Sequence, residues 1–214
     1  MNEPVQLGRA TLYLGDCRDI LPTLPKVDAT LVSDVPYGVS YNSGWDNKFR
    51  GVRIANDDNT EARDAVLSSW SGPAIIFGTW KVARPPGVKA LLVWEKGTVG
   101  MGDLSVPWFP NTEEIYVIGD GWTGSRVSSV LRYPVRNEFH PTEKPIELMR
   151  HLIARCVSPR IVDPFMGSGS TGVAAILEGR DFVGCEIEQA YFDIACKRIE
   201  DAQRQGDMFV GAAA

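Results

Sequence analysis

The regular alternation of two kinds of segment is the feature that most constrains the fold of this chain. Short apolar runs rich in β-branched and aromatic residues, bounded by Gly, Pro, Asp or Asn, predict strands, and segments with helical spacing lie between several of them. Such alternation predicts an α/β sheet with right-handed crossovers. The predicted strands cover residues 11–14, 29–33, 74–77, 90–94, 114–118, 160–162 and 182–185. The predicted helices cover residues 62–70, 144–156, 171–177 and 189–203.

Composition predicts one domain spanning residues 1–214. The chain is 44% hydrophobic and 23% charged, which is enough to bury one continuous core. No run approaches the roughly 20 apolar residues of a membrane span, and residues 1–4 do not begin a signal peptide, so we expect a cytoplasmic protein without a membrane partner. The four cysteines are scattered and only two histidines are present, so we expect reduced, packed thiols and no metal site.

The net charge of −5 argues against a protein that coats nucleic acid nonspecifically. Lys and Arg side chains that neutralise phosphates supply most of such binding, so any contact with nucleic acid has to be local. The candidate basic residues fall into three groups: Lys48, Arg50 and Arg53; Lys81, Arg84 and Lys89; and Arg126, Arg132 and Arg136.

Two loops follow predicted strands at the edge where open α/β sheets bind ligands. The second of them, residues 163–171, runs from a strand into an apolar helix and is rich in glycine, which lets the backbone approach a ligand. It lacks the Gly-Lys-Ser/Thr of a phosphate loop and the Gly-x-Gly-x-x-Gly spacing of a dinucleotide site. Glu186 ends the next strand, where a carboxylate can accept hydrogen bonds from ribose hydroxyls. Together these segments indicate an adenosine-type ligand.

The first loop contains Asp34-Val35-Pro36-Tyr37, which places a carboxylate, a rigid turn and an aromatic ring together. With it, four segments resemble, in order, the signature segments of the β-class S-adenosylmethionine-dependent DNA amino-methyltransferases. The resemblance covers nearly the whole chain and implies a seven-stranded Rossmann-like sheet, mostly parallel with one antiparallel strand, and a circularly permuted motif order. The four segments are residues 34–37, 140–145, 163–171 and 184–188.

The resemblance implies S-adenosylmethionine as cofactor and assigns its contacts. Asp16 and Cys17 match the position that binds the adenine ring, and Thr142 and Lys144 match the segment that meets the methionine end. The remaining expected cofactor contacts are Asp34, His140, Asp163, Pro164, Phe165, Gly167, Ser168, Gly169, Ser170, Thr171, Glu186 and Ile187.

The resemblance also assigns the catalytic turn. The Asp34 carboxylate and the Val35 carbonyl are expected to accept the two N–H groups of a base amine, which directs its lone pair to the methyl group and stabilises the developing positive charge. Tyr37 is expected to stack on the base, which has to be flipped out of the duplex. The family usually has Asp-Pro-Pro-Tyr, so Val35 in place of the first proline predicts a looser turn and slower transfer.

The target base and two alternatives stay open at this point. Asp34 as the first residue of the motif resembles adenine N6 enzymes, whereas N4-cytosine enzymes usually carry Ser. Methylation at cytosine C5 needs a cysteine nucleophile, normally after proline, and no Pro-Cys dipeptide occurs. Methylation of a protein amide or an RNA base, and a noncatalytic cofactor-binding or DNA-binding relative, are the alternatives.

The expected partner is double-stranded DNA, and a homodimer is possible because dimers are common in this class. The target-recognition insert is expected at residues 120–139, where Trp122, Arg126, Arg132, Tyr133 and Arg136 are candidate DNA contacts. So short an insert suggests a short or relaxed recognition sequence. Residues 40–59, rich in Asn, Asp, Gly and Arg, are expected to form a mobile loop over the flipped base.

Overall fold

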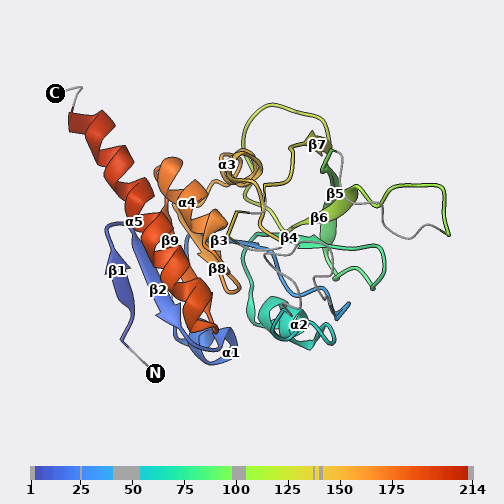
Figure 1. The fold of residues 1–214 in the computed structure, drawn as a ribbon, viewed down its shortest axis with the longest axis horizontal. Helices are drawn as coiled ribbons and strands as arrows, with labels where there is room; N and C mark the ends of the chain where they lie inside the picture. The colour runs from blue at the N-terminus through green and yellow to red at the C-terminus, as the bar shows by residue number, and fades with distance from the viewer. Residues whose placement is uncertain are drawn as a thin grey trace.

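One mixed sheet organises the protein. The computed structural model describes residues 3–24, 26–40, 54–97, 105–136, 138–139 and 142–211, with side chains as far as residue 205. The strands of these residues form a nine-stranded sheet in the order β1-β2-β9-β8-β3-β4-β6-β5-β7 (Figure 1). Their bounds are β1 Val5–Leu7, β2 Ala10–Leu14, β3 Ala29–Ser33, β4 Ala74–Gly78, β5 Val88–Glu95, β6 Thr112–Ile118, β7 Val130–Arg132, β8 Arg160–Asp163 and β9 Asp181–Glu186.

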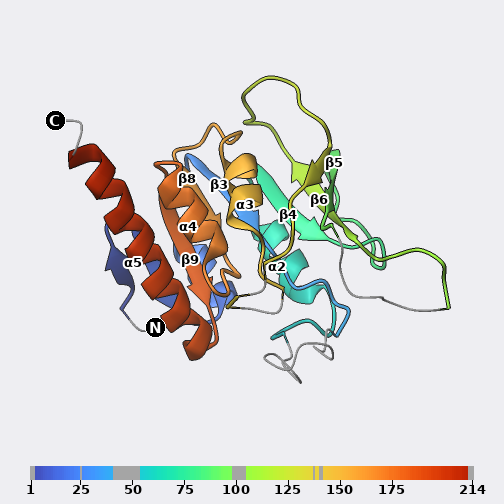
Figure 2. The ribbon, with the colours of Figure 1, turned by 45° about the horizontal axis from the view of Figure 1, so that its top comes forward.

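Helices cover both faces of this sheet. α3, α4 and α5 lie on one face, and in Figure 2 α4 and α5 lie side by side across the strands. α1, the short 3-10 helix η1 and α2 lie on the other face. Their bounds are α1 Cys17–Ile20, η1 Leu21–Thr23, α2 Glu61–Ser69, α3 Ile146–Ile153, α4 Ser170–Leu177 and α5 Gln189–Gly211.

Strand periodicity divides the core between the two faces. Successive side chains of a strand point to opposite faces, so Val32 packs with Leu148 of α3 and Val173 of α4, whereas Leu31 packs with Ile20 and Val66 below the sheet. All five residues of β3 are buried, as expected of a central strand covered on both faces.

The sheet of the described residues has nine strands rather than the seven predicted, and two strands, rather than one, run against the common direction of the others. β6 runs antiparallel to β4 and β5, and β1 runs antiparallel to β2. The two additional strands, β1 and β7, have three residues each and lie at the sheet edges. Strands this short carry no readable hydrophobic period, and pairing with a long neighbour defines them.

Helix ends also differ from the sequence prediction. α3 occupies residues 146–153 of the predicted 144–156, because Pro145 is the N-cap rather than a residue of the first turn. α5 continues to residue 211, beyond the predicted end at 203. α1 was not predicted, since a helix of four residues is too short to show a helical period.

The topology brings several chain segments to one edge of the sheet. β2, β9, β8, β3 and β4 are parallel, so their carboxyl ends lie together there. β5 points the same way because it is antiparallel to β6, which is in turn antiparallel to β4. The amino end of β6, with Thr112 and Glu113, therefore lies at this same edge. This edge carries the candidate site.

Candidate active site

A cavity of about 500 Å³ unites the two predicted loops. The turn after β3 and the glycine-rich turn after β8 both line it, together with the ends of β2 and β9. The predicted site residues that line it are Asp16, Cys17, Asp34, Val35, Pro36, Tyr37, Thr142, Lys144, Asp163, Pro164, Phe165, Gly167, Ser168, Ser170, Thr171, Glu186 and Ile187.

Two predicted cofactor residues are not among the lining residues. His140 lies outside the described residues. Gly169 is the N-cap of α4 with φ +86°, and a side chain there would meet Ala195 of α5 at 3.0 Å. Gly169 therefore makes a left-handed turn and a close helix packing rather than a wall of the cavity. Of the predicted mobile loop 40–59, residues 41–53 lie outside the described residues.

Glu186 is tied to the glycine turn. Its Oε2 accepts the Gly167 N–H at 2.9 Å, and its Oε1 accepts the Glu188 N–H at 2.8 Å. Burial raises the pKa of this carboxyl group although both N–H groups favour its charged form. Each oxygen has a further lone pair, so Glu186 can accept two more hydrogen bonds from a ligand in the cavity.

Asp16 follows the neighbouring strand β2 and is the N-cap of α1. Its carboxylate accepts the Arg18 N–H at 2.9 Å and pairs with the Arg18 guanidinium at 2.5 Å. These bonds lower the pKa of Asp16. The carboxylate is thus held in place as an acceptor, while Cys17 packs its side chain into the core and the pKa of its thiol is raised to about 12 by burial and by Asp16.

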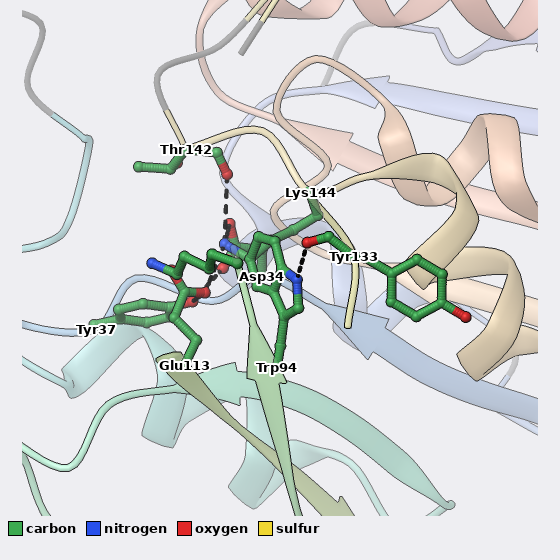
Figure 3. Close-up of polar contacts among 8 residues, drawn as sticks. Asp34, Tyr37, Trp94, Glu113, Tyr133, Thr142 and Lys144 are labelled. Carbon is green, nitrogen blue, oxygen red and sulfur yellow. Dashed lines mark hydrogen bonds and ion pairs between the residues drawn. The ribbon is translucent and has the colours of Figure 1, made fainter. Parts of the chain in front are cut away.

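Asp34 is bonded on both of its oxygens (Figure 3). Its Oδ2 accepts the Lys144 ammonium at 2.6 Å, and its Oδ1 accepts the Tyr37 hydroxyl at 2.8 Å. Burial raises the pKa of Asp34 and outweighs the nearby Lys144, which favours the ionised form. Val35 is only 2% exposed and packs in the core, so packing restrains this turn.

Glu113, from the amino end of β6, completes this network. Glu113 Oε2 lies 3.0 Å from the Tyr37 hydroxyl and 3.3 Å from the Lys144 ammonium. Glu113 Oε1 lies 2.5 Å from the Lys96 ammonium. Burial opposes ionisation of Glu113, but the two lysines bring its pKa below the usual value. Burial also opposes the charge on Lys144, yet Asp34 and Glu113 raise its pKa. The negative charges of two carboxylates and the positive charges of two ammonium groups thus balance within the cavity wall.

Aromatic rings surround the Lys144 ammonium. Its Nζ lies 5.0 Å from the ring centre of Phe77, 5.6 Å from that of Tyr37 and 5.8 Å from that of Trp94. The Trp94 indole N–H donates to the Tyr133 carbonyl at 2.8 Å, which fixes that ring (Figure 3). Such ring faces attract a cation wherever it sits between them.

Sequence reasoning missed Glu113, Lys96 and Trp94 as cavity residues. The sequence prediction considered the loops after parallel strands, whereas Glu113 lies within the antiparallel strand β6, near its amino end, and Lys96 follows β5. It also missed the buried pair of Glu143 with Arg198, whose atoms Oε1 and Nη2 lie 2.6 Å apart. A strand direction is a pairing property, so the sequence carries no direct signal for it.

The basic candidates for DNA contact have three different surroundings. Several basic residues are paired with a carboxylate: Arg84 with Glu114, Lys89 with Asp120, Arg132 with Glu95 and Arg136 with Glu147. Lys81 lines the cavity. Lys48, Arg50 and Arg53 lie outside the described residues.

The aromatic candidates of the predicted insert are engaged within the protein. Trp122 donates its indole N–H to the Gly119 carbonyl at 2.9 Å and packs on the core. The Tyr133 hydroxyl lies 3.0 Å from His151 Nδ1, and its ring also packs on the core. Packing therefore accounts for both rings.

Solved structures share this fold. The M1.HpyAVI–SAM complex superimposes with a TM-score of 0.63 at 24% identity, covering 88% of this chain and 99% of that one. The cytosine-N4-specific PvuII DNA methyltransferase gives a TM-score of 0.66 at 15% identity and covers 92% of each chain. The fold is thus the mixed α/β fold of DNA methyltransferase structures. No helix in the described part of the chain is long and apolar enough to cross a membrane.

Sequence comparisons define the family. The model of a family described as "DNA methylase" matches residues 95–197. The Escherichia coli (strain K12) protein named "Putative methylase YubD" is 41% identical over 214 residues, covering 89% of this chain and 90% of that protein. The chain belongs to this DNA methylase family.

Other curated relatives match over a shorter region. The type II methyltransferase M2.DpnII of Streptococcus pneumoniae is 42% identical over 83 residues, which is 38% of this chain and 30% of that protein. The DNA adenine methyltransferase YhdJ of Escherichia coli (strain K12) is 36% identical over 88 residues, which is 40% of this chain and 29% of that protein. The matched region thus spans about a third of the length of these two relatives.

Proposed function

We propose that this protein transfers a methyl group from S-adenosylmethionine to the N6 amino group of adenine in double-stranded DNA. The observation that carries the proposal is that one cavity joins the Asp34 turn to the glycine turn and Glu186. A site for an amine and a site for an adenosine-type ligand thus open on the same space, as transfer between them requires.

The donor set of the cavity fits the cofactor. Glu186 has acceptor capacity for two ribose hydroxyls, and Asp16 presents a fixed carboxylate for an adenine amino group. An added side-chain atom at Gly167 would have no neighbour within 4 Å, so the turn leaves room for a ligand beside its backbone. A volume of about 500 Å³ lies within the usual range of small-molecule sites. When bound, the cofactor supplies an electrophilic methyl group.

The residues of the amine turn prepare the nucleophile. The Asp34 carboxylate and the Val35 carbonyl accept the two N–H groups of the amine, which turns the nitrogen lone pair away from the ring. Asp34 then faces the positive charge that develops on the nitrogen and stabilises it. The new nitrogen–carbon bond would form as the bond between the methyl carbon and the sulfonium sulfur breaks, and the methylated amine would then lose one proton. The protein therefore needs no covalent intermediate.

Adenine is favoured by Asp34 at the first position of the motif and by a relative whose name states adenine. We propose a flipped base as the substrate, because an amine within a base pair cannot reach Asp34. The order of the amine turn before the glycine turn, on neighbouring strands β3 and β8, supports a circularly permuted member of the class.

The test is methyl transfer to duplex DNA with tritiated S-adenosylmethionine, followed by mass spectrometry of the nucleosides. We expect N6-methyladenine. N4-methylcytosine would overturn the choice of base alone, and cofactor binding without transfer to any DNA would overturn the enzymatic proposal.

Substitution of Asp34 tests its role. Asp34→Ala is expected to lower the transfer rate by at least about 100-fold, the usual scale for losing one preorganised charge-stabilising group. Cofactor binding, measured by calorimetry, is expected to weaken far less than transfer, because Asp34 is only one of many expected cofactor contacts. Asp34→Asn removes the charge but keeps the shape of the side chain, so it separates loss of charge from a folding effect. Asp201→Asn on the exposed surface of α5 is the control that should retain full activity. Unchanged transfer by both Asp34 variants would contradict the assignment.

A further inference from the structure

The Asp34 carboxylate is not simply open to an incoming amine. Its Oδ2 holds the Lys144 ammonium at 2.6 Å, and its Oδ1 holds the Tyr37 hydroxyl at 2.8 Å. Each Asp34 oxygen keeps a further lone pair for the amine, but the ammonium group neutralises much of the negative charge that Asp34 presents to it. The ammonium group also opposes the positive charge that develops on the amine during transfer. Withdrawal of Lys144 from Asp34 would therefore strengthen the charge stabilisation proposed for Asp34.

A second position for the ammonium exists beside the first. Glu113 Oε2 lies 3.3 Å from Lys144 Nζ, so a small displacement converts a long contact into a full ion pair. Phe77, Tyr37 and Trp94 surround the ammonium at ring-centre distances of 5.0 to 5.8 Å and attract it along this path. The Lys144 side chain is only 4% exposed, so water offers no comparable alternative.

Glu113 is held ready to accept this charge. Lys96 pairs with Oε1 at 2.5 Å, which fixes the carboxylate and leaves Oε2 directed at Lys144 and the Tyr37 hydroxyl. The Glu113 side chain is 16% exposed and comes from a strand rather than from a mobile loop. A buried carboxylate with this orientation is costly unless an ammonium stays near it.

We infer that Glu113 is a positioning residue that takes over the Lys144 ammonium when a base amine binds Asp34. The inference rests on the proposed function and adds to it an exchange of ion pairs. Lys144 moves from Asp34 to Glu113, Asp34 stays ionised, and its freed Oδ2 accepts the amine N–H. No net charge enters or leaves the cavity wall in this exchange.

The first test removes the charge of Glu113. In Glu113→Gln, Lys144 has only Asp34 as a carboxylate partner, so kcat for methyl transfer at saturating cofactor is expected to fall at least tenfold. Glu95→Gln is the matched control, because Glu95 lies at the same edge of the sheet but pairs with the exposed Arg132 outside the cavity. The control is expected to keep kcat within twofold. Equal kcat values for Glu113→Gln and wild type would overturn the inference.

A double variant separates positioning from structural damage. Lys144→Met combined with Glu113→Gln removes the opposing ammonium, so kcat is expected to rise at least threefold above that of Glu113→Gln alone, with both measured at saturating cofactor. If each substitution only damaged the fold, the two losses would add and kcat of the double variant would be lower still. A double variant no faster than Glu113→Gln would overturn the inference.

The pH profile supplies a readout that a structural role would not move. Lys144 and Tyr37 contact Asp34, and Glu113 and Asp163 act on it through like charge. Glu113 raises the pKa of Asp34, so Glu113→Gln is expected to move the acid limb of kcat/KM to lower pH. Glu113→Asp keeps the negative charge, so the acid limb is expected to stay in place. Its kcat is expected to fall less than that of Glu113→Gln. An acid limb unmoved in Glu113→Gln would overturn the inference.

The two proposals fail in different ways. Wild-type protein that transfers no methyl group would overturn the proposed function and this inference with it. Active wild type with an unaffected Glu113→Gln variant would overturn the inference alone.

Discussion

Asp163 ends β8 directly below the glycine turn, and its carboxyl group is buried. It accepts the Ser33 hydroxyl at 2.6 Å and the Phe165 N–H at 3.0 Å, both on Oδ1. Burial nevertheless raises its pKa from 3.8 to about 6, because these bonds compensate only partly for lost hydration. One residue thus shapes the turn at a cost to the stability of the folded protein near neutral pH.

Because the buried Asp163 carboxylate destabilises the folded protein, Asp163→Asn is expected to raise the unfolding free energy by an amount that depends on pH. The folded state binds the proton more tightly than the unfolded state, so the stability contributed by the protonated group is complete below pH 3.8 and is lost as pH rises through about 6. Relative to wild type, Asp163→Asn should gain roughly 3 kcal/mol of unfolding free energy between pH 4 and pH 8. Urea titrations across this range measure it. A constant difference between the two proteins would contradict the raised pKa.

At the scale of elements, Glu143 and Arg198 connect the segment before α3 to α5. Glu143 Oε2 accepts the N–H groups of Glu138 and Phe139 at 3.0 Å, and Oε1 pairs with Arg198 at 2.6 Å. Arg198 also donates to the Ser168 carbonyl at 2.8 Å, within the glycine turn. One buried pair therefore fixes three segments that border the cavity.

Breaking this pair should destabilise the protein. Arg198→Met leaves Glu143 buried without its cation, which is expected to lower the unfolding free energy by about 3–5 kcal/mol. Arg204→Met is the control on the same helix, because Arg204 pairs with Glu200 at the exposed surface and its loss should cost at most about 1 kcal/mol. Denaturant unfolding of both variants checks the ranking, and equal losses would contradict it.

At the scale of the whole molecule, charge limits how the protein can hold DNA. The net charge is −5, and Arg84, Lys89 and Arg132 are each paired with a carboxylate. Within the described part of the chain these three candidate cations already have a carboxylate partner, so under the proposed function we expect DNA recognition to depend mainly on the cavity and its rim.

The salt dependence of DNA binding measures this limit. We expect a slope of log affinity against log salt that corresponds to fewer than about six phosphate contacts. Lys81→Gln at the cavity rim should reduce the slope by about 1, whereas Lys89→Gln, whose ammonium already pairs with Asp120, should not change it. Binding titrations between low and moderate salt provide the slopes. Equal slopes for the two variants would remove Lys81 from the DNA contact surface.

The sequence by itself determined the central strands and the two turns of the cavity. β3, β4 and β9 are strands of five or six residues and β8 is one of four, all bounded by turn residues. The loops after β3 and β8 follow from the rule that parallel strands end at a common edge. Asp34, Asp163 and Glu186 could be predicted for this reason, because each lies within one residue of the carboxyl end of such a strand. For these three residues, the pattern of apolar runs and turn residues along the chain was sufficient to predict their position at the cavity.

Only the tertiary structure decided the position of Glu113, the pairing of Lys144 and the edge strands β1 and β7. Glu113 reaches the cavity because β6 runs antiparallel between β4 and β5, and strand direction follows from pairing across the sheet. The ion pairs of Lys144 join residues 110 and 31 positions apart in the chain. Contacts at such separation leave no period in the sequence, so the partner of Asp34 became visible only in three dimensions.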